Sequence, residues 1–235
     1  MIAKRTVLSE YLKSIKNLVF PQLCYSCEKY TIFNKELFCV SCQYNLPETD
    51  YHHYPENNFS RRFWGKVNVK GGAALYLFRK GGGVQHVIHQ FKYTGKIEIG
   101  MRLGEYYGEK LLKTPLFNSI DAIVPVPLHP QKLMWRGFNQ SEIFAQGLSI
   151  SMKKPVINLL ERKVFTTTQT KKEVLDRHEN MDEVFQLRLL ENHRYFKHIL
   201  LVDDVLTTGA TLTSCAKVLT DNGYQVSMAT LAISI

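Results

Sequence analysis

The stretch that decides the fold is residues 198–211, with the sequence HILLVDDVLTTGAT. Its apolar run is too short for a separate helix and is typical of a strand buried on both faces. Two carboxylates, Asp203 and Asp204, stand where we expect this strand to end, and a turn of small and hydroxyl residues follows. A helix then begins and stops at Asn222-Gly223. Together these elements predict a phosphate-binding loop at the carboxyl end of a parallel sheet.

This stretch resembles the phosphoribosyl pyrophosphate (PRPP) motif of type I phosphoribosyltransferases. The resemblance implies that the acidic pair holds the ribose 2′- and 3′-hydroxyls and that the turn holds the 5′-phosphate. Read from the residues alone, the alternative is that the acids cap a turn and Thr211 caps a helix. Arg136 is added to the predicted site because its guanidinium matches pyrophosphate oxygens. The predicted PRPP-binding residues are Asp203, Asp204, Thr207, Thr208, Gly209, Ala210, Thr211 and Arg136.

The composition of the 235 residues, 45% hydrophobic and 22% charged, predicts a globular protein with a real core. No apolar run reaches the roughly 18–20 residues of a membrane span. Glu10 and Lys13 interrupt any signal-peptide core, so we expect a cytoplasmic location. Leu8 and Leu12 lie on one face of a predicted N-terminal helix with basic neighbours. We interpret it as a packing helix, with peripheral contact to the cytoplasmic membrane as the alternative.

Four cysteines follow in the pattern C-x2-C, eleven residues, C-x2-C. In a chain without a secretory signal this pattern predicts tetrahedral zinc rather than disulfides, with a redox-active thiol cluster as the alternative. Four thiolates leave no open coordination position, so the zinc is expected to be structural. Glu28 and Gln43 stand where a glycine usually follows each pair. The predicted zinc ligands are Cys24, Cys27, Cys39 and Cys42.

The net charge of +9 is unevenly distributed. Basic residues dominate between Asn57 and Arg102, where Glu98 is the sole acid, and aromatic residues are interleaved among them. This combination suits phosphate contacts and base stacking on single-stranded nucleic acid. The alternative is a solvated basic surface around a PRPP pocket, which would have a similar composition. The candidate nucleic-acid contacts are Arg61, Arg62, Arg79, Lys80 and Lys92.

A long polar and basic stretch over 161–182 is expected to be either a lid or a disordered segment, because structureless segments of this length are uncommon in compact domains. Phosphoribosyl transfer needs magnesium on the leaving pyrophosphate, cations around it and a cover that excludes water. The candidate lid contacts are Lys171, Lys172 and Arg177. No catalytic residue and no acceptor can be assigned from the sequence.

The motifs together resemble the ComF (ComFC-type) competence protein family. They are the cysteine module, Phe91–Gly95, Pro125–Pro127, Arg136–Gln140, Gln169-Thr170, Arg177 with Asn180, and the PRPP motif. The resemblance implies a role in natural transformation, handling incoming single-stranded DNA at the cytoplasmic side of the membrane beside the DNA-uptake machinery. It does not settle catalysis. A purine or pyrimidine salvage phosphoribosyltransferase and a non-catalytic PRPP-sensing regulator are the alternative functions.

We therefore predict an α/β protein of the type I phosphoribosyltransferase fold, a parallel sheet flanked by helices, with an N-terminal four-cysteine zinc-finger module. The expected parts are an N-terminal helix (1–20), the zinc finger (21–47), a linker (48–65) and a phosphoribosyltransferase-like domain (66–235, core 118–235). Two short strands are expected over 66–69 and 73–78, parted by Gly71-Gly72, and further strands over 120–126, 155–160, 184–185 and 224–235. Helices are expected over 84–91, 101–112 and 138–149, and a loop over 128–139.

Overall fold

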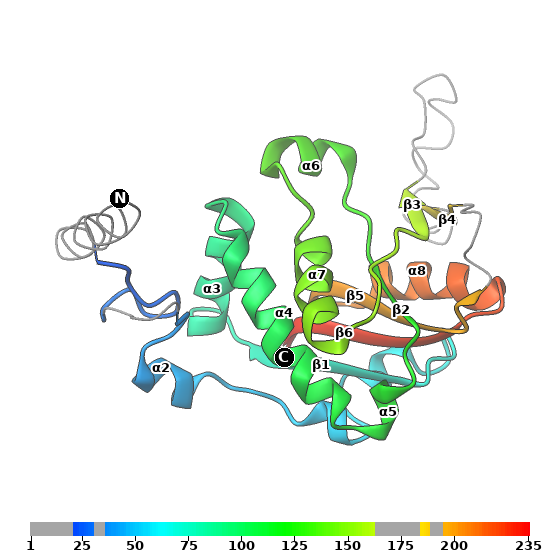
Figure 1. Cartoon of the computed structure of the whole chain (residues 1–235), viewed down its shortest axis with the longest axis horizontal. Helices are drawn as coiled ribbons and strands as arrows, with labels where there is room; N and C mark the ends of the chain where they lie inside the picture. The colour runs from blue at the N-terminus through cyan, green and yellow to red at the C-terminus, as the bar shows by residue number, and fades with distance from the viewer. Residues whose placement is uncertain (1–20, 31–35, 163–183, 189–194) are drawn as a thin grey trace, which may run out of the picture.

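The computed structural model describes residues 21–30, 36–162, 184–188 and 195–235. Its centre is a parallel sheet in the order β1-β6-β5-β2 (Figure 1). The strands are β1 (Gly71–Phe78), β2 (Ala122–Pro125), β5 (His198–Leu206) and β6 (Gln225–Ser234). The predicted fold class, a parallel sheet flanked by helices, is confirmed.

Four helices cover the two faces of this sheet. They are α3 (Gly83–Tyr93), α4 (Ile97–Leu112), α7 (Gln140–Met152) and α8 (Ala210–Asp221). The first three share one hydrophobic cluster, and α8 belongs to a second cluster. The helices expected over 84–91, 101–112 and 138–149 are confirmed, each with slightly different ends.

Strand β5 is buried on both faces, as its apolar run predicts. Leu200 and Val202 pack in the cluster that contains α4 and α7, whereas Ile199 and Leu201 pack in the cluster that contains α8. This alternation follows from the two-residue period of a strand. The last residues of β5 are therefore held at a fixed height between two layers of helices.

Helices α4 and α7 approach each other through glycine. A Cβ atom on Gly104 would lie 2.4 Å from the carbonyl oxygen of Phe144, and one on Gly147 would lie 2.1 Å from that of Met101. No side chain fits at either distance, so the two backbones pack in direct contact. The start of α7 is thereby fixed against the sheet.

The smaller elements connect these layers. They are α2 (Val40–Asn45), the 3-10 turns η1 (Tyr51–His53) and η2 (Ser60–Phe63), α5 (Pro115–Asn118), α6 (Pro130–Arg136), and the antiparallel pair β3 (Leu160–Arg162) and β4 (Phe185–Leu187). Figure 1 shows α6 projecting from the body of the molecule.

The prediction of two short strands parted by Gly71-Gly72 is wrong. One strand, β1, begins at Gly71 and runs to Phe78, and residues 66–69 form no strand. Glycine is needed here because a neighbouring side chain packs directly against the strand backbone: a Cβ on Gly72 would lie 2.3 Å from a ring carbon of Phe59. A local glycine signal does not distinguish a chain break from such packing.

Three further expectations need correction. The stretch over 155–160 is not a regular strand: it contributes a single bridge between Val156 and Ile123, and β3 begins only at Leu160. The loop expected over 128–139 contains α6, which begins at Pro130. Strand β5 does not end at the acidic pair but continues to Leu206, because its pairing with β6 extends that far.

The residues expected to form a linker, 48–65, are packed against β1. Asn57 Nδ2 donates hydrogen bonds to the carbonyl oxygens of Tyr51, Tyr54 and Gly72 at 2.8–3.0 Å. Phe59 is fully buried. The cysteine module is also joined to the main core, because Cys24 and Leu37 belong to the cluster around α4. The predicted domain boundaries stay a prediction, and the predicted N-terminal helix lies outside the described residues.

Candidate functional site

The predicted phosphate loop lies between β5 and α8. Gly209 has a φ of +86°, which favours glycine, and it precedes the first turn of α8. The loop surrounds a small hollow of about 30 Å³. Its lining residues are Asp203, Val205, Leu206, Thr207, Thr208, Gly209, Ala210, Thr211 and Leu212. Seven of the eight predicted PRPP-binding residues therefore lie on one strand–loop–helix unit, and all but Asp204 of these seven line the hollow.

Asp203 is held in place by two hydrogen bonds to one oxygen. Ser141 Oγ, on the first turn of α7, and the backbone N–H of Asp204 each donate to Asp203 Oδ1 at 2.8 Å. Burial and the neighbouring charge of Asp204 raise the pKa of Asp203 to about 7. The free site therefore binds a proton more readily than an ordinary aspartate does.

Asp204 forms an ion pair with Lys92, a residue of α3. Lys92 Nζ lies 2.8 Å from Asp204 Oδ2, and the two side chains are only 19% and 14% exposed. Lys92 therefore neutralises one acid of the predicted ribose site, and its predicted contact with nucleic acid stays a prediction. A ligand that uses Asp204 must share it with this ammonium or displace it.

Arg62, another candidate nucleic-acid contact, also lies at this site. Its Nη1 donates to the carbonyl oxygen of Thr207, and its Nη2 donates to that of Ser234 at the end of β6. One guanidinium thus ties the phosphate loop to the last strand. Ser141, Lys92 and Arg62 were not predicted as parts of this site. For Lys92 a signal existed, because it lies within the Phe91–Gly95 motif.

Arg136 ends α6 and is placed by its neighbours. Its Nη1 donates to Gln140 Oε1 at 2.8 Å, and its guanidinium lies 5.3 Å above the ring of Tyr93. Its Nε is buried without a hydrogen-bond partner among the described residues. No hydrogen bond joins Arg136 to the phosphate loop within that part of the chain, so its contact with pyrophosphate stays a prediction.

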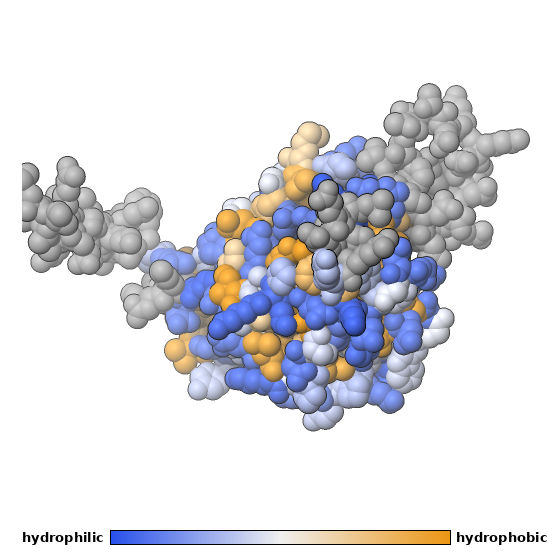
Figure 2. All heavy atoms as spheres, turned by 45° about the vertical axis from the view of Figure 1, so that its right-hand side comes forward, coloured by the Kyte–Doolittle hydropathy of each residue, from blue (hydrophilic) through white to orange (hydrophobic). Residues whose placement is uncertain are grey.

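The surface of α6 is partly hydrophobic. Met134 and Trp135 are strongly exposed, and the Trp135 ring lies 5.6 Å from that of Tyr93. Figure 2 shows hydrophobic spheres reaching the top of the molecule, where Figure 1 places α6.

The remaining basic candidates are on the surface. Arg61 lies 5.8 Å above the ring of the exposed Trp64. Arg79 and Lys80 are exposed in the loop that follows β1. The predicted lid contacts Lys171, Lys172 and Arg177 lie outside the described residues.

The four predicted zinc ligands come together. The Sγ atoms of Cys24, Cys27, Cys39 and Cys42 all lie within 4.8 Å of one another, and those of Cys27 and Cys39 are 3.9 Å apart. Tetrahedral zinc with Zn–S bonds of about 2.3 Å requires sulfur–sulfur distances of about 3.8 Å, so the cluster fits a metal. Glu28 adopts a φ of 53°, which makes the tight turn without glycine, and its carboxylate accepts a hydrogen bond from Gln90.

Comparison with known proteins reveals several relatives. Over 143 residues the chain is 36% identical to Competence protein F of Haemophilus influenzae, and the match covers 59% of this chain and 62% of that protein. Over 141 residues it is 33% identical to the DNA utilization protein YhgH of Escherichia coli K12, covering 58% and 61%. The chain is thus similar in sequence to competence proteins of the ComF type. The resemblance inferred from the sequence motifs is thereby confirmed.

The ComF-type similarity extends to Competence protein ComFC of Bacillus subtilis, with 28% identity over 151 residues, 64% of this chain and 59% of that protein. The chain spans less than two thirds of the length of these relatives. No protein-family model matches it.

Solved structures of phosphoribosyltransferases also show a loose similarity. Adenine phosphoribosyltransferase from Leishmania tarentolae matches with a TM-score of 0.37 and 15% identity, over 60% of this chain and 73% of that one. Orotate phosphoribosyltransferase from Aeropyrum pernix matches with a TM-score of 0.33 and 15% identity, over 74% and 90%. Among the described helices, none is long and apolar enough to cross a membrane.

Proposed function

We propose that this ComF-type chain binds PRPP at the β5–α8 loop and acts in the handling of incoming DNA during natural transformation. The observation that supports the PRPP site most strongly is the order of groups on one rigid unit. Two carboxylates on a buried strand are followed by a glycine turn and the start of a twelve-residue helix. The carboxylates accept hydrogen bonds from vicinal hydroxyls, and the helix start favours phosphate.

In this proposal PRPP binds as its magnesium complex. Among the described residues only the four cysteines form a group of three or more potential metal ligands, so we expect no preformed carboxylate cage. Magnesium commonly binds through substrate phosphates and waters, with one or two carboxylates, and would stabilise the pyrophosphate charge. Among the described residues, Lys92 is the ammonium that pairs with the acidic pair and, when released from Asp204, is available to an anionic ligand.

We propose zinc as the metal of the cysteine cluster. The purified protein is expected to carry about one zinc per chain under reducing conditions, because four thiolates satisfy tetrahedral zinc completely. Inductively coupled plasma mass spectrometry measures the content, with Cys215→Ser as the control because Cys215 is buried in α8 away from the cluster. Cys39→Ser should lose most of the metal. Absence of metal from the wild-type protein, or retention in Cys39→Ser equal to the control, would contradict the assignment.

For single-stranded DNA we propose contacts through the exposed candidates. Arg61 with Trp64 offers a cation beside a stacking surface, and Arg79 and Lys80 add charge at the carboxyl end of β1. Arg62 and Lys92 are engaged within the PRPP site, so their contribution to DNA binding would be indirect. A cytoplasmic location beside the DNA-uptake machinery belongs to this proposal.

The function is tested by combining PRPP and magnesium with single-stranded DNA or a panel of free bases. We expect PRPP to bind and DNA affinity, measured by fluorescence anisotropy, to fall steeply with salt because phosphate contacts release counterions. Pyrophosphate release reports transfer. Release with a free base would replace the proposed role by salvage, and binding of PRPP without any DNA affinity would replace it by PRPP sensing.

A further inference from the structure

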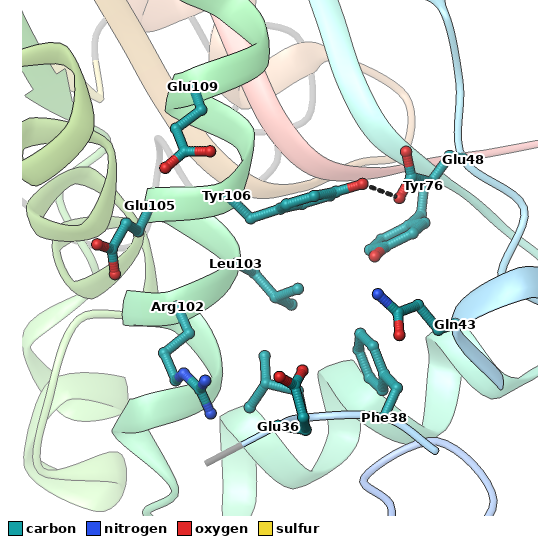
Figure 3. A pocket seen from close by; sticks show the side chains of 11 residues that line it. Glu36, Phe38, Gln43, Glu48, Tyr76, Arg102, Leu103, Glu105, Tyr106 and Glu109 are labelled. Atoms are coloured by element: carbon teal, nitrogen blue, oxygen red, sulfur yellow. Dashed lines mark hydrogen bonds between the residues drawn. The ribbon is translucent and has the colours of Figure 1, made fainter. Parts of the chain in front are cut away.

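A second cavity lies away from the phosphate loop, between the cysteine module and α4. Its volume is about 260 Å³ (Figure 3). One wall comes from residues 36–38 and Gln43 of the module, the opposite wall from one face of α4, and the end from Glu48 and Tyr76. None of these residues belongs to the PRPP site.

The cavity is acidic although the chain carries a net charge of +9. Four of its lining residues are glutamates, and Arg102 is the single cation. Glu36, Glu105 and Glu109 form no ion pair within the described part of the chain. The field of such a lining repels phosphate and attracts positive charge, so this cavity selects against the ligands proposed for the β5–α8 loop.

One wall already holds an ammonium group. Lys110 Nζ lies 2.9 Å from Glu48 Oε2 and 4.8 Å above the ring of Tyr106. The Tyr106 hydroxyl donates to the other oxygen of Glu48 at 2.7 Å, as the dashed line in Figure 3 marks. A carboxylate beside an aromatic face is a favourable site for a cation, and the remaining glutamates offer the same chemistry to a ligand.

Tyr76 supplies an independent sign of a ligand. Its side chain is only 5% exposed, and Figure 3 shows its hydroxyl pointing toward the middle of the pocket. That hydroxyl forms no hydrogen bond within the described residues and faces the open space of the cavity. Burial and the nearby charge of Glu48 raise the pKa of Tyr76, so the hydroxyl stays neutral and can accept an N–H group.

The lining excludes a bare metal ion. Within the described residues, the carboxylates of this pocket do not converge as a metal requires. Leu103 and Phe38 add apolar surface between the charged groups. A ligand that satisfies both features carries its charge on an apolar stem.

We propose that this pocket binds an organic cation on an apolar stem, a guanidinium or ammonium group with its methylene chain. Such a group is carried by an arginine or lysine side chain of a partner protein and by a free polyamine. The charge lies in the field of the glutamates that line the pocket, the Tyr76 hydroxyl accepts one of its N–H groups, and the stem lies against Leu103. This proposal does not depend on PRPP binding.

The test titrates the zinc-loaded full chain with n-butylguanidinium and its neutral isostere n-butylurea, and follows the amide NMR signals of Leu103 and Tyr106. Saturable shifts are expected with the cation, at least about fivefold tighter than with the urea. The double variant Glu105→Gln with Glu109→Gln should weaken binding of the cation about fivefold to tenfold, and Tyr76→Phe should weaken it about threefold. The exposed Glu56→Gln is the matched control and should change nothing.

Equal binding of n-butylurea, or the absence of saturable shifts in the millimolar range, overturns the proposal. A loss in Glu56→Gln as large as in the double variant does the same. Spermidine and an acetylated Gly-Arg-Gly amide distinguish the two sources of the cation. Tighter binding of spermidine supports a free polyamine, and tighter binding of the peptide supports a side chain of a partner protein. The PRPP affinity of Glu105→Gln with Glu109→Gln should stay that of the wild type, which separates this result from failure of the proposed PRPP site.

Discussion

Replacing both Asp203 and Asp204 by asparagine is expected to weaken PRPP binding about 100-fold or more. The two carboxylates are the proposed acceptors for the ribose hydroxyls, and each lost charge-assisted hydrogen bond costs about 1.5–3 kcal/mol. Calorimetry with magnesium present measures the affinity. Asp221→Asn, an exposed aspartate at the far end of α8, is the matched control. Unchanged affinity in the double variant would refute the site.

Asp203→Asn alone should leave the fold intact and raise its stability at neutral pH. Asp203 Oδ1 accepts both of its hydrogen bonds through one oxygen, which an asparagine retains. The pKa of Asp203 is about 7 in the folded chain, above the ordinary value of about 3.9 expected on unfolding. A raised folded-state pKa means that the stabilising contribution is present below about pH 4 and is lost as the pH rises through 7. Asp203→Asn should remove this slope, and PRPP affinity of the wild type should increase over the same interval as Asp203 ionises.

Lys92→Met is expected to destabilise the free protein by about 3 kcal/mol. The substitution leaves Asp204 largely buried beside Asp203 with no cation opposite it. Urea denaturation at pH 8 measures the loss, and Lys80→Met, at an exposed position, is the control. Adding Asp204→Asn to Lys92→Met should restore most of the stability, because it removes the uncompensated charge.

The loss of stability caused by Lys92→Met should be smaller at lower pH. Two adjacent carboxylates without a cation take up a proton more readily, so protonation relieves the repulsion as the pH falls. A Lys92→Met protein as stable as Lys80→Met at pH 8 would show that the ion pair contributes nothing. A loss that is independent of pH would indicate that Lys92 acts through packing of its methylene chain.

The sequence predicted those parts of the site that are local in the chain. The Asp203–Thr211 stretch and the cysteine spacing each carry their chemistry within a short window, and the structure brings their residues together as expected. Ser141, Lys92 and Arg62 reach the same site from α7, α3 and η2. Their roles depend on how layers pack, and no short-range pattern reports that.

The errors have a similar origin. Gly71-Gly72 was interpreted as an interruption, but the close approach of Phe59 to Gly72 requires glycine inside a strand. Polarity suggested a linker over 48–65, and that boundary stays a prediction; in the structure, Asn57 Nδ2 donates to three backbone carbonyl oxygens and joins this segment to β1. A polar residue satisfied by the backbone looks the same in sequence as one exposed to water.

The order of strands has a consequence for how the protein is made. β1 lies at one edge of the sheet, where Glu48 forms a single bridge with Tyr76, and its partner strand is β6, the last of the described strands in chain order. A growing chain that has already released β1 from the ribosome therefore carries an unpaired strand edge until residues 225–234 emerge. Such an edge invites pairing with other chains, and long-range parallel pairing is slow. Completion of the sheet, and of the Arg62 link from Ser234 to the phosphate loop, is thus expected to be a late event in folding, and nascent chains are most prone to aggregate before it.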